Sequence, residues 1–309
     1  MLPKEFKTHC DDFLSYIEVE RRMAHNTQRA YAGDLRQFLL FWEQLSPEDL
    51  ESLTPRQVVE RYLVSLFYKK IDKSSIARKF SCFKSLEKFL RPRGIMLNFK
   101  LTRPRVDKKL PVYLSVDEIF HLLDTVKNSE LPSLRPIRDK TLLELMYATG
   151  MRCSELVSVQ FKNLDLENKT ILIVGKGNKE RIVLFNEKAK IKIIDYLTHE
   201  RPAINNKDEC LFVNNRGGKL SSRSVQRIFE MFRGFLHLGR QLTPHKIRHS
   251  FATHLLNQGA DLRVVQELLG HKTLASTEKY THVSLENLTR MYETIHPLHT
   301  IIKKEIKES

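Results

Sequence analysis

The pattern of apolar residues in this chain breaks off between residues 99 and 114. The stretch FKLTRPRVDKKLPVYL holds two prolines and five lysines or arginines, and it has neither helical nor strand periodicity. Proline restricts its own backbone and that of the preceding residue, so such a stretch is typical of a linker. The sequence therefore predicts two domains, over residues 1–98 and 115–309, joined by a basic linker over 99–114. With 309 residues, the chain is long enough for each domain to bury its own core.

The part before the linker has the pattern of a small helical domain. In HNTQRAYAGDLRQFLLFW, apolar residues from Tyr31 to Trp42 recur at the spacing of one helix face. Thr54 followed by Pro55 is a helix start, and QVVERYLVSLFYKK continues that helix. A third amphipathic helix is expected in SSIARKFSCFKSLEKFLRPRG.

The part after the linker is mostly helical and contains one convincing β segment. SVDE, which starts at Ser115, is a capping-box pattern, and a helix over RDKTLLELMYATG is expected to stop at Gly150. In residues 170–185, TILIVGKGNKERIVLF, two β-branched runs flank a turn, which predicts a hairpin with Lys176 near its tip. The fold class is therefore mainly α with a small β-sheet.

Positive charge is concentrated around the linker. The net charge is +15, and residues 69–109 hold 14 lysines and arginines against three acidic residues. Such a band is typical of a surface that binds nucleic-acid phosphates, because each neutralised phosphate releases counterions. A solvated lysine face that keeps the protein soluble would have the same composition. The candidates for DNA contact lie on the polar face of the third helix and in the linker: Arg78, Lys79, Lys84, Lys88, Arg103, Arg105, Lys108 and Lys109.

Composition argues against a membrane or secreted protein. No apolar run is long enough to span a bilayer, and the N-terminus MLPKEFKTHCDDFLSY contains acidic residues, unlike a signal peptide. The four cysteines are scattered with no CxxC pair, which favours reduced thiols over disulfides or a zinc knuckle. We expect a cytoplasmic protein.

The common nucleotide and metal motifs are absent from the sequence. It has no GxxxxGK[ST], no GxGxxG after a strand, no DxDxDG loop and no acidic cluster suited to two magnesium ions. His245 and His249 have a spacing that can bind zinc, but Lys246 stands where zinc proteases have glutamate, and it would repel a cation. The sequence predicts neither a metal nor a cofactor.

The same segment, LTPHKIRHSF, is better suited to an anion. His245 and Arg248 project from one helix face, and Thr243 followed by Pro244 places them near the helix N-terminus, where free N–H groups favour a phosphate. Arg152 and Lys176 are further cationic candidates. Taken singly, each of these four would be an ordinary surface cation or a half-buried histidine.

In combination, these motifs resemble the tyrosine recombinases, in particular the Xer chromosome-dimer resolvases. The resemblance rests on ATGMRCSELVSV, GKGNKERIVLF, LTPHKIRHSFATHLLNQGADLRVVQELLGHKTLASTEKYTHV and the closing His296-Pro297, and it covers about residues 145–297. The pattern NTxxAYxxDLxxF, residues 26–38, matches the N-terminal part in kind. The resemblance implies a SAM-like core-binding domain and a recombinase catalytic domain that form a C-shaped clamp on DNA.

The resemblance also implies a site of six residues: Arg152, Lys176, His245, Arg248, His271 and Tyr280. Tyr280 would be the nucleophile that attacks a DNA phosphodiester, giving a 3′-phosphotyrosyl bond and a free 5′-hydroxyl without ATP or metal. The two arginines would bind the non-bridging oxygens, and Lys176 would protonate the leaving oxygen. The two histidines would assist, and which one serves which proton transfer stays open.

As partners, the resemblance implies double-stranded DNA with a specific site, and a tetramer made with a second related recombinase or with copies of this chain. The role would be chromosome partition at cell division, with activation by a septal DNA translocase as an option. The XerC-like, XerD-like and sole-recombinase roles stay open. A last helix across 284–293 would pack into a neighbouring protomer or onto its own domain.

Three alternatives remain. An integrase or transposase of a mobile element, or a type IB-like topoisomerase, would use the same chemistry. The compact N-terminus, with no arm-binding domain before residue 1, favours the Xer-like interpretation over a phage integrase. A non-catalytic architectural DNA-binding protein would have no physical reason to keep Lys176 and Tyr280 together.

Overall fold

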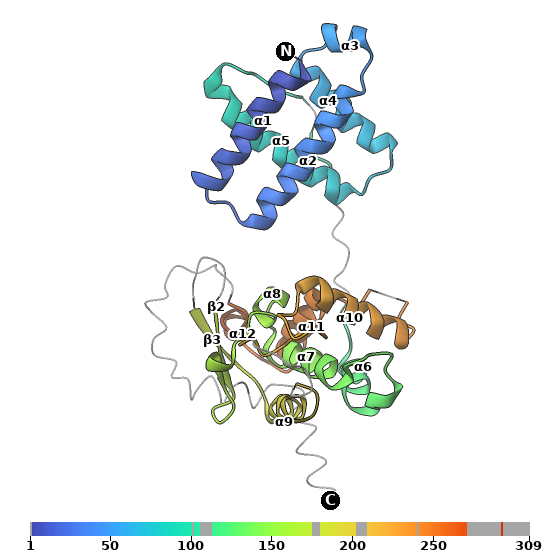
Figure 1. Cartoon of the computed structure of the whole chain (residues 1–309), viewed down its shortest axis with the longest axis vertical. Helices are drawn as coiled ribbons and strands as arrows, with labels where there is room; N and C mark the ends of the chain where they lie inside the picture. Colours follow the sequence, from blue (N-terminus) through green and yellow to red (C-terminus); the bar gives the residue numbers. More distant parts are fainter. Residues whose placement is uncertain are drawn as a thin grey trace, which may run out of the picture. The chain divides into compact units, whose positions relative to one another are not determined.

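The computed structural model describes residues 2–100, 102–105, 113–174, 180–201, 209–239, 241–270 and Tyr292. The chain divides into two compact units, Met1–Leu110 and Pro111–Ser309 (Figure 1). Each unit has its own hydrophobic core. The predicted fold class, mainly α with a small sheet, is confirmed.

The N-terminal unit is a helical bundle. Its helices are α1 (Pro3–Val19), α2 (His25–Glu43), α3 (Pro47–Ser52), α4 (Pro55–Tyr68) and α5 (Lys73–Leu90), followed by the 3₁₀ turn η1 (Arg91–Arg93). Thr54 caps α4 as predicted, because its side chain accepts from the backbone N–H of Gln57. Aromatic rings fill the core, where Phe38 packs edge-to-face on Phe83 with ring centroids 5.0 Å apart and also contacts Trp42.

The C-terminal unit is built around one buried helix, α7 (Pro136–Thr149). Every side chain from Arg138 to Thr149 is buried, so this helix has no solvent face. The buried carboxylate of Glu200 accepts the backbone N–H groups of Ile137 and Arg138, which caps the start of α7.

Other helices complete the described part of this unit. They are α6 (Val116–Phe120), α8 (Cys153–Leu156), α9 (Glu187–Asp195), α10 (Ser222–Phe235), α11 (Pro244–Asn257) and α12 (Leu262–Leu269). Single turns add η2 (His121–Thr125), η3 (Asn128–Glu130), η4 (Phe161–Asn163) and η5 (Tyr196–Glu200). Helices α9 and α11 pack directly on α7 (Figure 1). The predicted capping box at Ser115 is present, and α7 ends at Gly150 as expected.

The sheet has three antiparallel strands in the order β1 (Leu164–Asp165), β2 (Thr170–Val174) and β3 (Glu180–Leu184). The β2–β3 hairpin was predicted, whereas β1 is too short to leave a sequence signal. Ile171 pairs with Val183 and Ile173 with Arg181, and the three apolar members of these pairs are buried. Arg181 therefore lies on the inward face of β3.

Tyr292 belongs to the core of the C-terminal unit. Its side chain is 2% exposed, and its hydroxyl donates to the carbonyl of Ala148 at 2.8 Å. The rest of the helix expected across 284–293 lies outside the described residues. Among the described residues, no helix is long and apolar enough to cross a membrane.

Candidate active site

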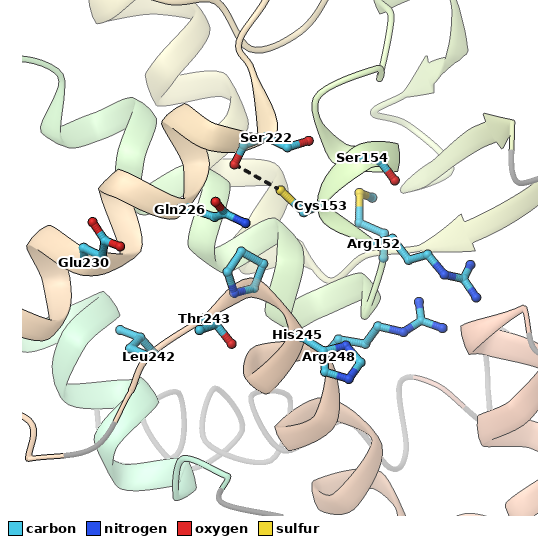
Figure 2. A pocket seen from close by; sticks show the side chains of 12 residues that line it. Arg152, Cys153, Ser154, Ser222, Gln226, Glu230, Leu242, Thr243, His245 and Arg248 are labelled. Atoms are coloured by element: carbon cyan, nitrogen blue, oxygen red, sulfur yellow. Dashed lines mark hydrogen bonds between the residues drawn. The ribbon is translucent and has the colours of Figure 1, made fainter. Parts of the chain in front are cut away.

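Three of the six predicted site residues line one cavity of about 540 Å³: Arg152, His245 and Arg248. Figure 2 shows the two guanidinium groups pointing to the same side, with the His245 ring beside Arg248. The remaining lining residues come from the turn into α8, from α8 and α10, and from the segment that leads into α11, and they are Met151, Cys153, Ser154, Ser222, Gln226, Glu230, Leu242, Thr243 and Pro244. The cavity therefore joins segments about 90 residues apart in sequence.

Arg152 is placed by the turn between α7 and α8. Its backbone N–H donates to Oε2 of Glu155 at 2.7 Å, and its Nη1 donates to Oε1 of the same carboxylate at 2.9 Å. Its side chain is 46% exposed, so the guanidinium is anchored on one side and open to solvent on the other.

Arg248 is held much more deeply. It is 7% exposed, and its guanidinium donates to the backbone carbonyls of Gly150 and Leu269 at 2.6 Å each. Burial and the nearby positive charge of Arg152 lower the pKa of Arg248 to about 10, and Glu155 opposes that shift. The side chain is still a cation at neutral pH, so the cavity has a fixed positive charge at its base.

His245 is exposed on the first turn of α11, three residues before Arg248. Thr243 caps this helix, since its side chain accepts from the N–H of Lys246, and Pro244 occupies the first turn. The N-terminal end of a helix favours an anion. The His245 side chain and the Arg248 guanidinium thus line the same cavity at the start of this helix.

Two glycines in the left-handed conformation set the chain direction at the edges of the site. Gly150 has φ +60°, and a Cβ there would meet Cδ1 of Phe251 at 2.4 Å and Cδ2 of Leu269 at 2.9 Å. Gly270 has φ +64° and ends α12, and a Cβ there would meet Nε of Arg181 at 2.7 Å. Only glycine fits at either position without strain.

The other three predicted site residues, Lys176, His271 and Tyr280, lie outside the described residues. Their described neighbours in the chain are Val174 and Glu180 on the hairpin and Gly270 at the end of α12.

The expected polar face of α5 needs one correction. Lys79 does not lie on it: the residue is 4% exposed, and its ammonium bonds Asp34 at 2.9 Å and Gln37 at 2.7 Å. Lys79 was expected on the polar face because lysine is usually solvated, although its spacing from Ile76 and Phe83 puts it on the buried face of α5, where it meets Asp34. Arg78 is also bound to Asp34, although its side chain is 42% exposed.

The other basic candidates are exposed where the structure describes them. These are Lys84, Lys88, Arg103 and Arg105, whereas Lys108 and Lys109 lie outside the described residues. Lys84 pairs with Glu87 at 2.8 Å and lies over the ring of Phe99.

The sequence analysis missed two charged residues beside Arg152. Glu155 is 5% exposed, and Arg181 binds both of its oxygens at 2.9 Å. The signal for Glu155 was its place three residues after Arg152 at a helix start. The signal for Arg181 was strand alternation, which puts it on the same face as the buried Val183.

Among the described residues, no group of three or more His, Cys, Asp or Glu side chains is arranged to hold a metal ion. His254, farther along α11, is bonded through Nδ1 to the hydroxyl of Tyr147 at 2.8 Å.

Comparison with known proteins places this chain in a family. Residues 113–287 match the phage integrase family, and residues 10–94 match the phage integrase N-terminal SAM-like domain. The chain is 37% identical to tyrosine recombinase XerC of Thermodesulfovibrio yellowstonii, over 93% of this chain and 95% of that protein. It is 36% identical to tyrosine recombinase XerD of Staphylococcus aureus, over 94% and 99%.

A solved structure agrees with these sequence relatives. XerH site-specific recombinase bound to its difH substrate has a TM-score of 0.66 at 25% identity, over 92% of this chain and 83% of that chain. The resemblance read from the motifs is confirmed. The chain therefore belongs to the phage integrase family, in which the curated relatives that it matches along nearly their whole length are Xer tyrosine recombinases.

Proposed function

We propose that this protein is a site-specific tyrosine recombinase that cuts and rejoins DNA and resolves chromosome dimers at cell division. The observation that carries the proposal is the cavity in which Arg152, His245 and Arg248 converge. Two guanidinium groups and a histidine at a helix start are suited to one phosphodiester.

Arg152 and Arg248 would neutralise the charge that grows on the non-bridging oxygens during transesterification. Arg248 is suited to this task because its bonds to two backbone carbonyls fix its position before DNA arrives. A preorganised donor needs no rearrangement at the moment of reaction, and removing one typically lowers the rate by roughly 10²–10³.

Tyr280 is the proposed nucleophile. Its phenolic oxygen forms a bond to phosphorus as the bond to the 5′-oxygen breaks, and the departing oxygen takes a proton from Lys176. His245 and His271 donate hydrogen bonds to the phosphate, and one of the two accepts the phenolic proton that Tyr280 loses as its bond to phosphorus forms. The covalent intermediate divides one difficult displacement into two easier steps, and attack by a 5′-hydroxyl reverses it without an external energy source.

Both domains would bind the same DNA duplex. The helical domain of residues 1–98 and the catalytic domain of residues 115–309 would form a C-shaped clamp, with the basic linker 99–114 following the backbone. The high positive charge of residues 69–109 supports this role. Four protomers, of this chain alone or with a second recombinase, would exchange the strands in the cytoplasm, with a septal DNA translocase as the activating partner.

Covalent trapping tests the proposal. DNA duplexes that bind the protein are first selected from a random pool. Each selected duplex is then nicked, so that the fragment released by cleavage diffuses away. The protein is incubated with these duplexes in the presence of a chelator and without ATP. We expect a denaturant-resistant protein–DNA adduct that Tyr280→Phe abolishes. Tyr68→Phe is the matched control, because Tyr68 is 84% exposed on the N-terminal unit.

Two outcomes would contradict parts of the proposal. An adduct that persists in Tyr280→Phe would assign the nucleophile elsewhere. Tight DNA binding with no adduct, alone and with a second recombinase added, would favour an architectural protein.

A further inference from the structure

Three charged side chains meet beside the cavity, with a carboxylate between two guanidinium groups. Glu155 accepts two hydrogen bonds from Arg181, Nη1 to Oε1 and Nη2 to Oε2, at 2.9 Å each. The guanidinium of Arg152 donates to the same carboxylate through Nη1 only, at 2.9 Å, and the backbone N–H of Arg152 donates to Oε2 at 2.7 Å. Arg181 is thus the bidentate partner, and Arg152 holds Glu155 from one side.

The three charges do not cancel. Burial alone would raise the pKa of Glu155, but hydrogen bonds from Arg181 and Arg152 hold it below its ordinary value, so the carboxylate is ionised at neutral pH. Guanidinium groups stay protonated. Two cations and one anion leave a net charge of about one positive unit, on the side where Arg152 is exposed.

Arg181 is fixed in place by its surroundings. Its side chain is 17% exposed, and Gly270 approaches so closely that a Cβ there would lie 2.7 Å from Nε and 2.8 Å from Cδ. Within the described part of the chain, this Nε is buried without a hydrogen-bond partner. The fork of Arg181 therefore has one available orientation, toward Glu155.

We propose that Arg181 is a positioning residue that neutralises Glu155 and thereby leaves the charge of Arg152 available to the scissile phosphate. If Arg181 were uncharged, Glu155 would pair with Arg152 alone, and the positive charge facing the cavity from this trio would fall to about zero. This inference rests on the proposed function in assigning a phosphate to Arg152. The role follows from charge and geometry, and Arg181 itself does not touch the reacting atoms.

Inorganic phosphate is the probe for the first test. The arginine side-chain NMR signals, assigned with Arg152→Lys and Arg248→Lys, are followed during a phosphate titration of the full chain. We expect Arg181→Gln to weaken binding at Arg152 roughly tenfold, since a unit charge is lost within a few ångströms of a partly exposed site. Arg227→Gln, which removes an exposed charge from α10 of the same unit, is the matched control.

The decisive variant is the double substitution Arg181→Gln with Glu155→Gln. It restores the net charge of the trio, so we expect phosphate affinity to return to within about threefold of the wild type. A merely structural role for the Arg181–Glu155 pair predicts that the double variant is as weak as Arg181→Gln or weaker, and that result would overturn the inference. Unchanged affinity in Arg181→Gln would overturn it too.

A second arm covers the case in which Arg181→Gln does not fold. Glu155→Gln alone raises the net charge of the trio, so we expect tighter phosphate binding at Arg152, and equal or weaker binding would contradict the proposal. The phosphate titration needs no DNA cleavage. If the wild-type protein forms no DNA adduct, but the wild type and the variants show the expected order of phosphate affinities, the recombinase proposal is contradicted and this inference is supported.

Discussion

The guanidinium of Arg248 donates a hydrogen bond of 2.6 Å to the carbonyl oxygen of Gly150, 98 residues earlier in the chain. A second bond of the same length goes to Leu269, so one side chain fastens the C-terminal ends of α7 and α12. Arg152 follows the first end, and His271 follows the second. The position of the candidate site thus depends on two helix ends that a single arginine holds together.

The first prediction concerns Gly150. Alanine there would strain a backbone at φ +60° and force a Cβ to within 2.4 Å of Phe251. We expect the C-terminal unit to lose about 2–4 kcal/mol, from the left-handed conformation and from overpacking. Urea unfolding followed by circular dichroism measures this loss.

The single tryptophan provides the internal control for Gly150→Ala. Trp42 is in the core of the N-terminal unit, so its fluorescence reports that unit alone, and its transition should not move. Gly33→Ala is the matched variant, because Gly33 lies within α2 and a Cβ there meets nothing within 4 Å. It should stabilise the N-terminal unit slightly, and equal destabilisation by both alanines would refute the steric explanation.

A second prediction separates two lysines of α5. Lys79→Ala leaves the buried Asp34 without one of its ion-pair partners, so we expect a loss of about 3 kcal/mol in the Trp42 transition. Lys88→Ala removes an exposed charge, so it should leave stability unchanged and lower the salt slope of DNA binding by about one. An unchanged slope for Lys88→Ala would mean that this part of α5 faces solvent in the complex.

The third prediction tests proton transfer by Lys176. Lys176→Ala should block cleavage of ordinary DNA, lowering the rate roughly 10²–10⁴-fold. It should cleave a substrate whose bridging 5′-oxygen is replaced by sulfur almost normally, because a thiolate leaves without a proton. Single-turnover rates on the two substrates make the comparison, and equal impairment on both would remove Lys176 from the acid role.

The fourth prediction is a pH dependence of stability that arises at Glu144. This α7 residue is fully buried, neither carboxylate oxygen has a hydrogen-bond partner among the described residues, and burial raises its pKa from 4.5 to about 7. The native state then holds a proton that the unfolded state releases. Stability should therefore fall as the pH rises from about 4.5 to about 7.

Glu144→Gln removes the ionisation and tests this dependence. The free energy of unfolding of this variant should equal that of the wild type near pH 4.5 and exceed it at pH 8 by up to about 3 kcal/mol. Urea unfolding of the C-terminal unit at several pH values provides the measurement. Identical pH profiles for the two proteins would show that Glu144 does not titrate in this range.

Much of the fold could be predicted from local signals. The capping patterns at Thr54 and Ser115, the glycine stop at Gly150 and the β2–β3 hairpin each depend on neighbouring residues, and each is present. The convergence of His245 and Arg248 also followed from helix spacing.

What the sequence did not reveal depends on contacts between distant segments. Lys79 looked like a surface lysine because Asp34, its buried partner, is 45 residues away in the chain. Arg181 looked like an ordinary charge in a hairpin because Glu155 reaches it across the fold. Periodicity can place one such residue on a buried face, as strand alternation does for Arg181, but it does not identify the distant charge that pairs with it.

The anchoring of Arg248 also limits how the protein can lose its activity. Substitution of this arginine removes two internal bonds together with the proposed ligand for phosphate, so it should damage the tertiary structure along with the chemistry. In a screen of random variants, proteins that are inactive yet accumulate normally should therefore rarely carry changes at Arg248. A descendant that keeps the fold but loses the reaction would therefore have to carry substitutions at site residues whose side chains make no structural contacts.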